Sequence, residues 1–396
     1  MPNAKKVSTA KNLLERNVAA VIVKSELEAV LKSGKKLRVK HGIDPTGENI
    51  HIGRAVVLWK LREFQELGHK IILIIGDYTA EIGDPSDKLE KRPFLAKEQI
   101  KKNLKDYLPQ IGKILDLEKT EVRHNSEWLS KLTFRETASL ADIFTFQQIL
   151  ERENFSSRLQ KNQPISLREG LYPLMQGYDS VAVKADLELG GSDQLFNILA
   201  GRKIQEFYGQ KPQNAITMKM LIGADGRKMS TSWGNVINIA DTPENMFGKT
   251  MAIRDDLIID YFTLATGVNG EEIKQREKEL AAGENPRNIK EKLALEIVRR
   301  YHGETAAQKA ALNFTKVFVK KETPSEVPTL KLAAYNMQLL NLITRAGVKS
   351  KSEARRLASQ KGVKINSQIK RDPNEILSLK SGDILQIGRR IFFKID

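Results

Sequence analysis

Cysteine is absent from this chain of 396 residues. Its absence excludes disulfide bonds, cysteine nucleophiles, iron–sulfur clusters and zinc sites with thiolate ligands. Histidine is scarce, with five residues, and no two of them stand at a metal-ligand spacing such as H-x-x-x-H. We therefore expect no metal ion that is bound by the protein itself.

Long apolar runs are also missing. Stretches such as Ile71–Ile75 suit a strand but fall far short of the roughly 20 residues that a membrane-spanning helix requires. The N-terminal stretch lacks the long apolar core of a signal peptide, and it carries Glu15 and leads directly into a helical pattern. We expect a cytoplasmic protein without a membrane partner.

Positive charge, in contrast, is abundant. Lys and Arg number 65 against 49 Asp and Glu, which gives a net charge of +16. A field of this sign favours a polyanionic partner, most often nucleic acid or an anionic membrane surface. Apolar residues make up 40% of the chain, which is enough for a folded core.

Apolar and amphipathic stretches alternate between residues 37 and 221. The predicted strands are Leu37–Ile43, Lys70–Tyr78, Thr120–Arg123, Ala185–Leu189 and Ala215–Leu221, and the helices between them include Ala55–Leu67, Leu167–Val183 and Gln194–Tyr208. This alternation predicts an α/β fold with a mostly parallel sheet covered by helices. Such sheets bind ligands beyond the carboxyl ends of their strands.

Composition divides the chain into three regions. Residues 1–222 carry the α/β pattern, with a helical insertion at about 130–165. Residues 223–330 hold a glycine-flanked loop and helical patterns, and they end in a polar linker with prolines at 320–329. Residues 335–396 form a separate small unit, in which positions 341–396 carry 13 basic and 5 acidic residues, half of the net charge.

Two segments suit phosphate binding. In the first segment, a strand ends at Ile43, a turn follows, and a helix begins near His51. The free N–H groups at the start of the helix attract phosphate, and Gly53 lets a nucleotide approach closely. Thr46 and His51 can donate hydrogen bonds to phosphate oxygens. An ordinary strand–turn–helix connection is the alternative. In the second, Gly223–Ser232, Lys228 lies on a loop and can neutralise a pyrophosphate, although a solvated surface loop is the alternative.

A third pattern lies on a predicted helix. Tyr172, Gln176 and Asp179 fall on one helical face, where a hydroxyl, an amide and a carboxylate require polar partners if they are buried. A bound amino acid supplies such partners. A polar solvent-exposed face is the alternative.

The two phosphate segments contain HIGR (His51–Arg54) and KMSTS (Lys228–Ser232). Their order and separation resemble the HIGH and KMSKS signatures of class I aminoacyl-tRNA synthetases, which bind ATP between them on a Rossmann-like sheet. Arg54 replaces the second histidine and keeps a cation facing phosphate. Thr231 replaces the second lysine and removes one charge.

The helical pattern, together with Gly190–Asn197 and Gly83–Ser86, narrows the resemblance to the tyrosyl branch of that family, in its bacterial subgroup with a KMSKS loop. The resemblance covers nearly the whole chain. It implies a Rossmann-like parallel-sheet catalytic domain, then an α-helical domain and a small α+β RNA-binding domain of the S4 type. It also implies a homodimer, and we place part of the dimer surface at Phe144–Leu150, with core packing as the alternative.

The implied reaction is the ATP-dependent attachment of L-tyrosine to tRNA(Tyr). Tyrosyl-adenylate forms with release of diphosphate, and the tyrosyl group then moves to the 3′ end of the tRNA. A substrate carboxylate that attacks phosphorus needs positioning and charge stabilisation, and magnesium arrives with ATP. The alternative is a non-catalytic RNA-binding protein, such as a splicing or regulatory factor, on the same scaffold.

The resemblance also assigns the tyrosine site. It places Asp179 at the phenol and Gln194 beside the reacting carboxylate, and it assigns the α-ammonium and the pocket walls to Asp44, Asp84, Asn125, Tyr172 and Gln176. Lys40 stands where many family members carry a tyrosine near the phenol. Its ammonium pairs with Asp179, donates to the phenol oxygen or points elsewhere.

The resemblance assigns the ATP site in the same way. The residues expected to bind ATP are Gly42, His51, Gly53, Gly191, Asp193, Lys228 and Met229. The residues expected to act on the transferring phosphates are Thr46, His51, Arg54, Lys88, Arg92, Lys228, Thr231 and Ser232. Among these, Lys88, Arg92 and Lys228 form a mobile cationic clamp on pyrophosphate.

The basic tail predicts an RNA-binding helix. Ser352 is expected to cap its N-terminus, Gly362 to end it, and Val363–Ile365 to begin a strand. The cations expected to contact RNA are Lys351, Arg355, Arg356, Lys361 and Lys364. The pattern resembles the S4 module, and a solvated basic face is the alternative.

Overall fold

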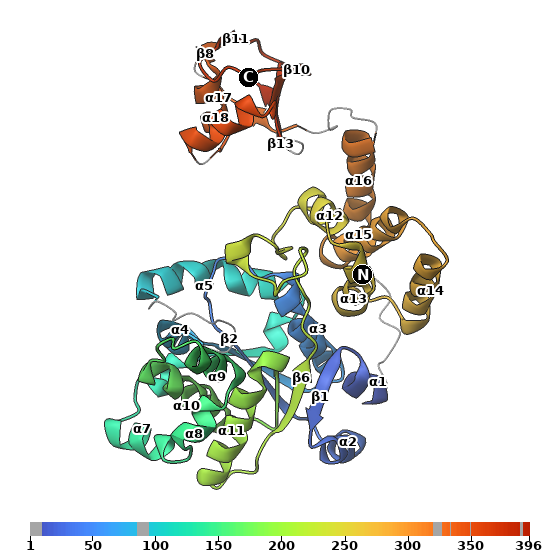
Figure 1. Ribbon diagram of the computed structural model, residues 1–396. Helices are drawn as coiled ribbons and strands as arrows, with labels where there is room; N and C mark the ends of the chain where they lie inside the picture. The colour runs from blue at the N-terminus through green and yellow to red at the C-terminus, as the bar shows by residue number, and fades with distance from the viewer. Residues whose placement is uncertain (1–9, 85–94, 320–326, 333, 349, 389–390) are drawn as a thin grey trace. The chain divides into compact units, whose positions relative to one another are not determined.

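The computed structural model describes residues 10–84, 95–319, 327–332, 334–348, 350–388 and 391–396. The chain forms two compact units, residues 1–308 and 309–396 (Figure 1). Each of the two units has a sheet of its own.

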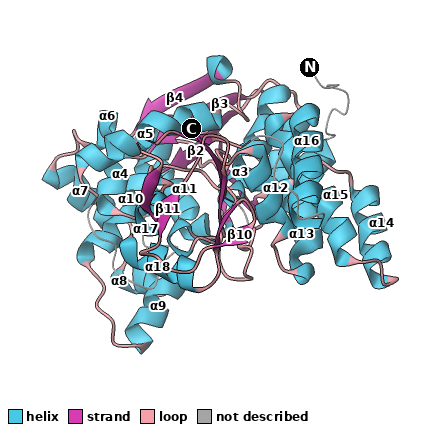
Figure 2. Cartoon of the chain, turned by 90° about the horizontal axis from the view of Figure 1, so that it is seen from above, coloured by secondary structure: helices cyan, strands magenta, loops and turns pink. Residues whose placement is uncertain are grey.

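The first unit is built on a six-stranded sheet with the order β1-β6-β5-β2-β3-β4. Figure 2 labels its strands β2, β3 and β4, which are neighbours in that order. Its strands are β1 (Val18–Ile22), β2 (Arg38–Ile43), β3 (Lys70–Ile75), β4 (Thr120–His124), β5 (Leu187–Gly191) and β6 (Asn214–Met218). Strands β2 to β6 run parallel, which confirms the predicted α/β sheet. Ile71–Ile75 are fully buried, and because successive side chains alternate between faces, both faces of the sheet are covered.

Strand β1 was not predicted, because we interpreted the N-terminal stretch as helical. The helix α1 (Ala10–Glu15) is short, and Val18–Ile22 then pairs with β6 as an antiparallel edge. Five apolar residues are too few for periodicity to distinguish a strand from a helix. Pairing with β6 decides the conformation.

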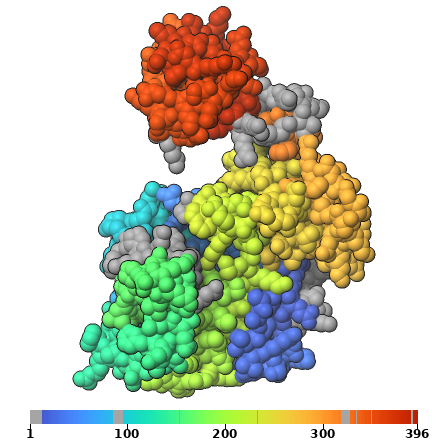
Figure 3. Space-filling model, viewed as in Figure 1, coloured from blue at the N-terminus to red at the C-terminus, as the bar shows by residue number. Residues whose placement is uncertain are grey.

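Helices surround this sheet. They are α2 (Lys24–Lys32), α3 (Ile52–Glu66), α4 (Asp77–Ile82), α5 (Lys97–Ile111), η1 (Leu117–Lys119), α6 (Ser126–Leu129), α7 (Phe134–Ala141), α8 (Phe146–Leu150), α9 (Glu153–Gln160), α10 (Leu167–Ala182), η2 (Ser192–Gln194) and α11 (Leu195–Phe207). Helices α7 to α9 form a lobe on the surface (green in Figure 3). The buried ion pair between Arg158 and Glu169, at 2.7 Å, joins α9 to α10.

Helices α10 and α11 pack closely at a glycine contact. A Cβ atom added at Gly177 would lie 2.6 Å from Cδ1 of Ile204 and 3.1 Å from the backbone nitrogen of Gly201. No side chain fits at such distances, so Gly177 sets how closely α11 approaches α10. This contact matters for the site because α10 carries Tyr172, Gln176 and Asp179.

The residues after β6 lie in the same compact unit as the sheet, although we predicted a domain boundary at 222/223. They comprise η3 (Thr231–Trp233), α12 (Pro243–Met251), η4 (Asp255–Leu257), α13 (Ile258–Ala265), α14 (Gly270–Ala281), α15 (Pro286–His302) and α16 (Glu304–Phe314), followed by a π-helical turn, η5 (Thr315–Val319). Compact packing joins residues up to 308 to the sheet. Tyr301 of α15, for example, accepts a hydrogen bond from Trp59 of α3 at 3.1 Å.

The second unit holds a five-stranded sheet, β10-β9-β12-β13-β7, and a two-stranded sheet, β11-β8. Its elements are β7 (Thr329–Leu330), β8 (Asn336–Gln338), α17 (Leu339–Arg345), α18 (Lys351–Ser359), β9 (Val363–Ile365), β10 (Gln368–Ile369), β11 (Ile376–Ser378), β12 (Ile384–Ile387) and β13 (Ile391–Ile395). The two helices and the strands enclose a core that includes Leu339, Ala354 and Leu385.

Two predicted boundaries in this unit were wrong. Most of the predicted linker lies outside the described residues, but Thr329 belongs to β7 and pairs with Lys394, so the folded tail begins before residue 335. Ser350 rather than Ser352 caps α18, because its hydroxyl accepts the N–H of Glu353 at 3.2 Å. Both serines precede Glu353, and only the backbone conformation distinguishes them.

We predict that Gly177→Ala lowers the free energy of unfolding by about 1–3 kcal/mol, because the new methyl group must displace α11 from α10. Gly170→Ala in the same helix is the matched control, since its Cβ would meet only Ile149, at 3.7 Å. Alanine is the better helix former, so this control should be neutral or more stable. Urea unfolding of both variants measures the difference, and equal destabilisation would contradict the packing argument.

Candidate active site

A pocket opens at the carboxyl ends of β2, β5 and β6. Strands β2 and β5 are neighbours, and the chain leaves β2 toward β3 on the other side, so the pocket lies at the switch point where ligands bind parallel sheets. It is lined by most of the predicted site residues, namely Gly42, Asp44, Thr46, His51, Gly53, Arg54, Asp84, Asn125, Tyr172, Gln176, Asp179, Gly191, Asp193, Gln194, Lys228 and Met229.

The carboxylate of Asp44, just after β2, organises one wall. It accepts a hydrogen bond from the Tyr172 hydroxyl at 2.9 Å and another from Thr79 at 2.8 Å. A Cβ at Gly76 would lie 1.9 Å from Oδ1 of Asp44, so glycine is required there. Burial, and then the charge of Asp44, raises the pKa of Tyr172 well above its usual value, so its phenol stays protonated and keeps donating to Asp44.

Asp179 lies at the buried end of the pocket. Its carboxylate accepts hydrogen bonds from the indole of Trp128 at 2.8 Å and from the amide of Asn125 at 3.4 Å. Burial raises the pKa of Asp179 to about 7, against the opposing effects of the Lys40 charge and these two donors. Asp179 therefore presents a desolvated acceptor that favours a hydroxyl donor over solvent.

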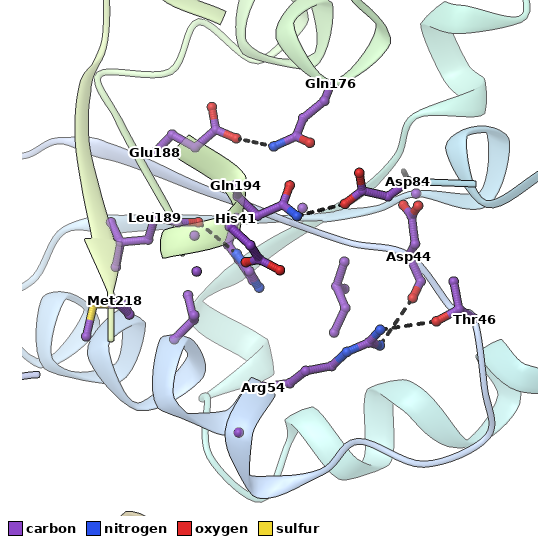
Figure 4. Close-up of a pocket in the computed structure, with 18 of the residues that line it drawn as sticks. His41, Asp44, Thr46, Arg54, Asp84, Gln176, Glu188, Leu189, Gln194 and Met218 are labelled. Atoms are coloured by element: carbon purple, nitrogen blue, oxygen red, sulfur yellow. Dashed lines mark hydrogen bonds between the residues drawn. The ribbon is translucent and has the colours of Figure 1, made fainter. Parts of the chain in front are cut away.

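Asp84 and Gln194 face one another across the pocket. The amide of Gln194 donates to Oδ2 of Asp84 at 2.7 Å (Figure 4). Its carbonyl accepts from Asn197 at 2.9 Å. Because Asn197 fixes the carbonyl side of Gln194, its NH₂ group must point toward Asp84. This contact links the loop after α4 to the end of β5.

Gly53 and His51 form the beginning of α3. His51 caps this helix, with its Nδ1 accepting the N–H of Arg54 at 3.3 Å, so its Nε2 carries the hydrogen that is available for donation. A Cβ at Gly53 would lie 3.0 Å from Nδ1 of His51 and 3.1 Å from the sulfur of Met229. The absent side chain allows the loop with Met229 to approach the N-terminus of α3, where N–H groups attract anions.

Arg54 holds the turn after β2. Its guanidinium donates to Thr46 at 3.1 Å and to the backbone carbonyl of Asp44 at 3.5 Å (Figure 4). It also donates to the hydroxyl of Tyr107 in α5, at 3.0 Å. Arg54 thus places a permanent positive charge beside Thr46 and anchors that turn to α5.

Lys228 lies at the opposite side of the pocket, in an ion pair with Asp193 at 3.0 Å. The pair joins the KMSTS loop to the end of β5. Thr231 does not line the pocket, and nothing is described of the Ser232 side chain. Lys88 and Arg92 lie outside the described residues.

Lys40 is not part of the pocket wall, so of the three alternatives for its ammonium the structure shows the third, in which it points away from Asp179 and the phenol. Its ammonium is fully buried behind the wall and forms an ion pair with Glu188 at 3.0 Å. Both residues sit in strands, and the registers of β2 and β5 place them opposite one another. The sequence did not reveal which acid lies across from Lys40.

Sequence reasoning missed four residues that shape the site: His41, Tyr107, Trp128 and Glu188. His41 lines the pocket with its Nδ1 2.9 Å from the carbonyl of Leu189, and burial lowers its pKa, which favours the neutral imidazole. The position of His41 next to Gly42 was the sequence feature that could have identified it as a pocket residue. For Glu188, the corresponding feature was a charged residue within an otherwise apolar strand.

Among the described residues, no group of three or more histidine or acidic side chains is arranged to hold a metal ion. No helix in the described part of the chain is long and apolar enough to cross a membrane.

The predicted RNA-binding cations lie on and after α18. Ala354 and Ala358 bury one face of this helix, and Lys351, Arg355 and Arg356 are exposed. Lys361 is exposed and Lys364 half-buried. The second unit thus presents a row of cations on one helix.

Family models match both units. Residues 32–319 match the model described as tRNA synthetases class I (W and Y), and residues 337–385 match the S4 domain model. The chain is similar to a tyrosine–tRNA ligase of Thermotoga maritima, with 48% identity over 386 residues, 97% of this chain and 96% of that protein. It is also similar to one of Haemophilus influenzae, with 44% identity over 98% and 97% of the two chains.

Solved structures resemble the fold. A tyrosyl-tRNA synthetase from Archaeoglobus fulgidus, complexed with L-tyrosine, aligns with a TM-score of 0.62 and 23% identity, over 77% of this chain and all of that one. A C-terminally truncated mitochondrial enzyme from Aspergillus nidulans aligns with a TM-score of 0.65 and 20% identity, over 80% and 95% of the two chains.

The raised pKa of Asp179 predicts a pH-dependent stability. Because the pKa rises from 3.8 in the unfolded chain to about 7 in the folded one, the folded state holds a proton that the unfolded state releases. The free energy of unfolding should therefore fall by up to about 1.4 kcal/mol per pH unit as pH rises from roughly 4 to 7, and level off above.

Asp179→Asn removes this term, so wild type should lose stability relative to the variant between pH 5 and pH 8. Urea unfolding followed by tryptophan fluorescence measures both proteins, and every other titrating group cancels in the comparison. Parallel pH profiles would show that Asp179 does not titrate in this range.

Proposed function

Because the chain belongs to the class I tRNA synthetases for tryptophan and tyrosine, we propose that it attaches L-tyrosine to tRNA(Tyr) with ATP. The reaction has two steps: tyrosyl-adenylate forms with release of diphosphate, and the tyrosyl group is then transferred to the tRNA 3′ end. Similarity to tyrosine–tRNA ligases along nearly the whole chain supports this activity. A non-catalytic protein would not need the polar side chains that line the pocket, so their presence favours the enzyme over this alternative.

The observation that carries the proposal is the buried carboxylate of Asp179 at the inner end of the pocket. A tyrosine side chain that enters the pocket brings its phenol hydroxyl to Asp179, whose buried carboxylate accepts it in addition to Trp128 and Asn125. Tyr172, Gln176 and Asp84 then surround the α-ammonium. Gln194, held by Asn197, lies next to the carboxylate that attacks ATP.

The phosphate end of the pocket supplies the donors for activation. Thr46 and His51 bind the phosphates at the start of α3, where the helix dipole also favours negative charge. Arg54 and Lys228 add permanent cations on opposite sides, and stabilise charge that develops on the departing diphosphate. Magnesium enters with ATP, coordinated by phosphate oxygens and water rather than by a protein cage.

The chain lacks the second lysine of the loop signature, and we infer that another cation at the phosphate end of the pocket compensates for it. Thr231 supplies no charge, whereas Arg54 adds one at a position where the family signature has a histidine. Lys228 is held by Asp193 in the absence of ATP. Release of this ion pair when phosphate arrives frees Lys228 for the diphosphate.

The second unit binds tRNA. The S4 match and the exposed cations of α18 support this role. We also propose a cytoplasmic location, which the similarity to bacterial tyrosine–tRNA ligases supports.

The homodimer is a further part of the proposal, and the apolar residues on the lobe of α7 to α9 support it. Phe134 is 91% exposed and Phe146 69% exposed. The predicted surface Phe144–Leu150 is narrower than we expected, because Ile149 is buried and Phe144 packs against Phe196. We therefore place the contact between the two subunits mainly at Phe146.

ATP–diphosphate exchange with single amino acids tests the activity. Tyrosine should support exchange, and phenylalanine should be slower by more than about a hundredfold, because it withholds the hydroxyl donor that the desolvated Asp179 carboxylate accepts in addition to Trp128 and Asn125. Tryptophan distinguishes the two branches of the family and should be as poor. Comparable rates with tryptophan or phenylalanine would contradict the proposed substrate.

We predict that Arg355→Gln with Arg356→Gln weakens tRNA binding and makes it less sensitive to salt. Neither arginine forms an ion pair with a described residue, so both are available to phosphates. Each lost phosphate contact should lower the slope of log affinity against log salt by about 0.7–0.9. Filter binding at several salt concentrations measures the slope.

Lys380→Gln is the matched control, because this exposed cation of the same unit lies outside α18. Its slope should remain that of the wild type, and circular dichroism with thermal unfolding reports that each variant is folded. An unchanged slope in the double arginine variant would remove α18 from the tRNA surface.

A further inference from the structure

The buried pair Lys40–Glu188 lies at the wall of the tyrosine pocket, which Glu188 lines and Lys40 supports from behind. Lys40 is 0% exposed and Glu188 1% exposed, and their charged atoms are 3.0 Å apart. Burying two charges costs more than their attraction returns unless further hydrogen bonds satisfy both groups. A pair retained at such a place therefore calls for a functional reason.

Every donor of the Lys40 ammonium has a partner. Besides Glu188, it donates to the hydroxyl of Ser180 at 2.8 Å and to the backbone carbonyl of Gln176 at 2.9 Å. Glu188 in turn accepts from Ser180 at 3.2 Å and from the side-chain amide of Gln213. Both charged groups are thus fully paired, and their hydrogen bonds hold two residues of α10 against β2 and β5.

One further contact connects the pair to the pocket. The side-chain NH₂ of Gln176 donates to Oε1 of Glu188 at 3.2 Å (Figure 4). An ionised carboxylate only accepts hydrogen bonds, so the amide of Gln176 must turn its nitrogen toward Glu188. Its carbonyl oxygen then faces away from Glu188, on the pocket side of α10.

We propose that the Lys40–Glu188 pair is a positioning device that fixes the orientation of the Gln176 amide and so makes Gln176 an acceptor for the α-ammonium of the substrate. An ammonium group only donates hydrogen bonds, and it requires an oxygen rather than an NH₂ group at this place. Lys40 neutralises the charge of Glu188, so that a carboxylate can remain this close to the substrate. The inference rests on the proposed tyrosine substrate.

Exchanging the two charges tests the proposal. In Lys40→Glu/Glu188→Lys, the ion pair and its burial persist, but the group facing Gln176 becomes a donor, so the amide turns its NH₂ toward the pocket. The tyrosine Kd should then rise on the order of 10- to 100-fold, the range for a hydrogen bond to a charged group. The Kd of 3-(4-hydroxyphenyl)propionate, which lacks the ammonium, should change by less than about twofold.

Calorimetric titration of both compounds gives the two constants. Equal weakening of both would indicate general damage to the pocket and overturn the proposal, as would full retention of tyrosine affinity. If the exchanged protein does not fold, Lys40→Met/Glu188→Gln replaces it. A Gln at 188 accepts either orientation of Gln176, so the preference for tyrosine over the analogue should fall by a smaller factor, and an unchanged preference overturns the proposal.

Ser180→Ala is the matched control. It removes one partner of both Lys40 and Glu188 but leaves the contact between Glu188 and the Gln176 amide. The preference for tyrosine over the analogue should stay within about twofold of the wild type, and a selective loss in this control would contradict the orientation argument. A wild type that binds no tyrosine would refute the proposed function instead.

Discussion

The carboxylate of Asp44 joins parts of the first unit that lie far apart in the sequence. It stands at the end of β2, and accepts hydrogen bonds from Thr79 in α4 and from Tyr172 in α10. Its backbone carbonyl is also a partner of Arg54 in α3. Because three helices meet at this half-buried acid, the two ends of the pocket keep a fixed relation.

Three acids, two of them buried and one half-buried, shape this pocket. Asp44, Asp179 and Glu188 all line it, and each is held by hydrogen bonds from neutral groups as well as by its charge. The cost of desolvation differs among them. Asp179 has few compensating contacts and its pKa rises to about 7, whereas Glu188 has Lys40 beside it. A substrate with one hydroxyl and one ammonium satisfies groups that water reaches poorly.

The two units suit substrates of different size. The first holds the pocket, where precise distances matter, and its side chains are fixed by contacts such as the close approach of α10 to α11 at Gly177. The second presents exposed cations on α18. Phosphate recognition depends on charge more than on exact position, so it tolerates a small surface unit.

The periodicity of apolar residues determined the parallel sheet and the α10 face with Tyr172, Gln176 and Asp179. The distribution of charged residues determined the basic character of the tail. These follow from local patterns, since spacing along a helix and charge along a chain need no knowledge of neighbours. The sequence did not determine β1, the domain boundary after β6, or the cap of α18. It also left the partner of Lys40 open. Those depend on which strand pairs with which and on what lies opposite a buried charge, and only the folded chain brings β2 beside β5 so that Lys40 meets Glu188.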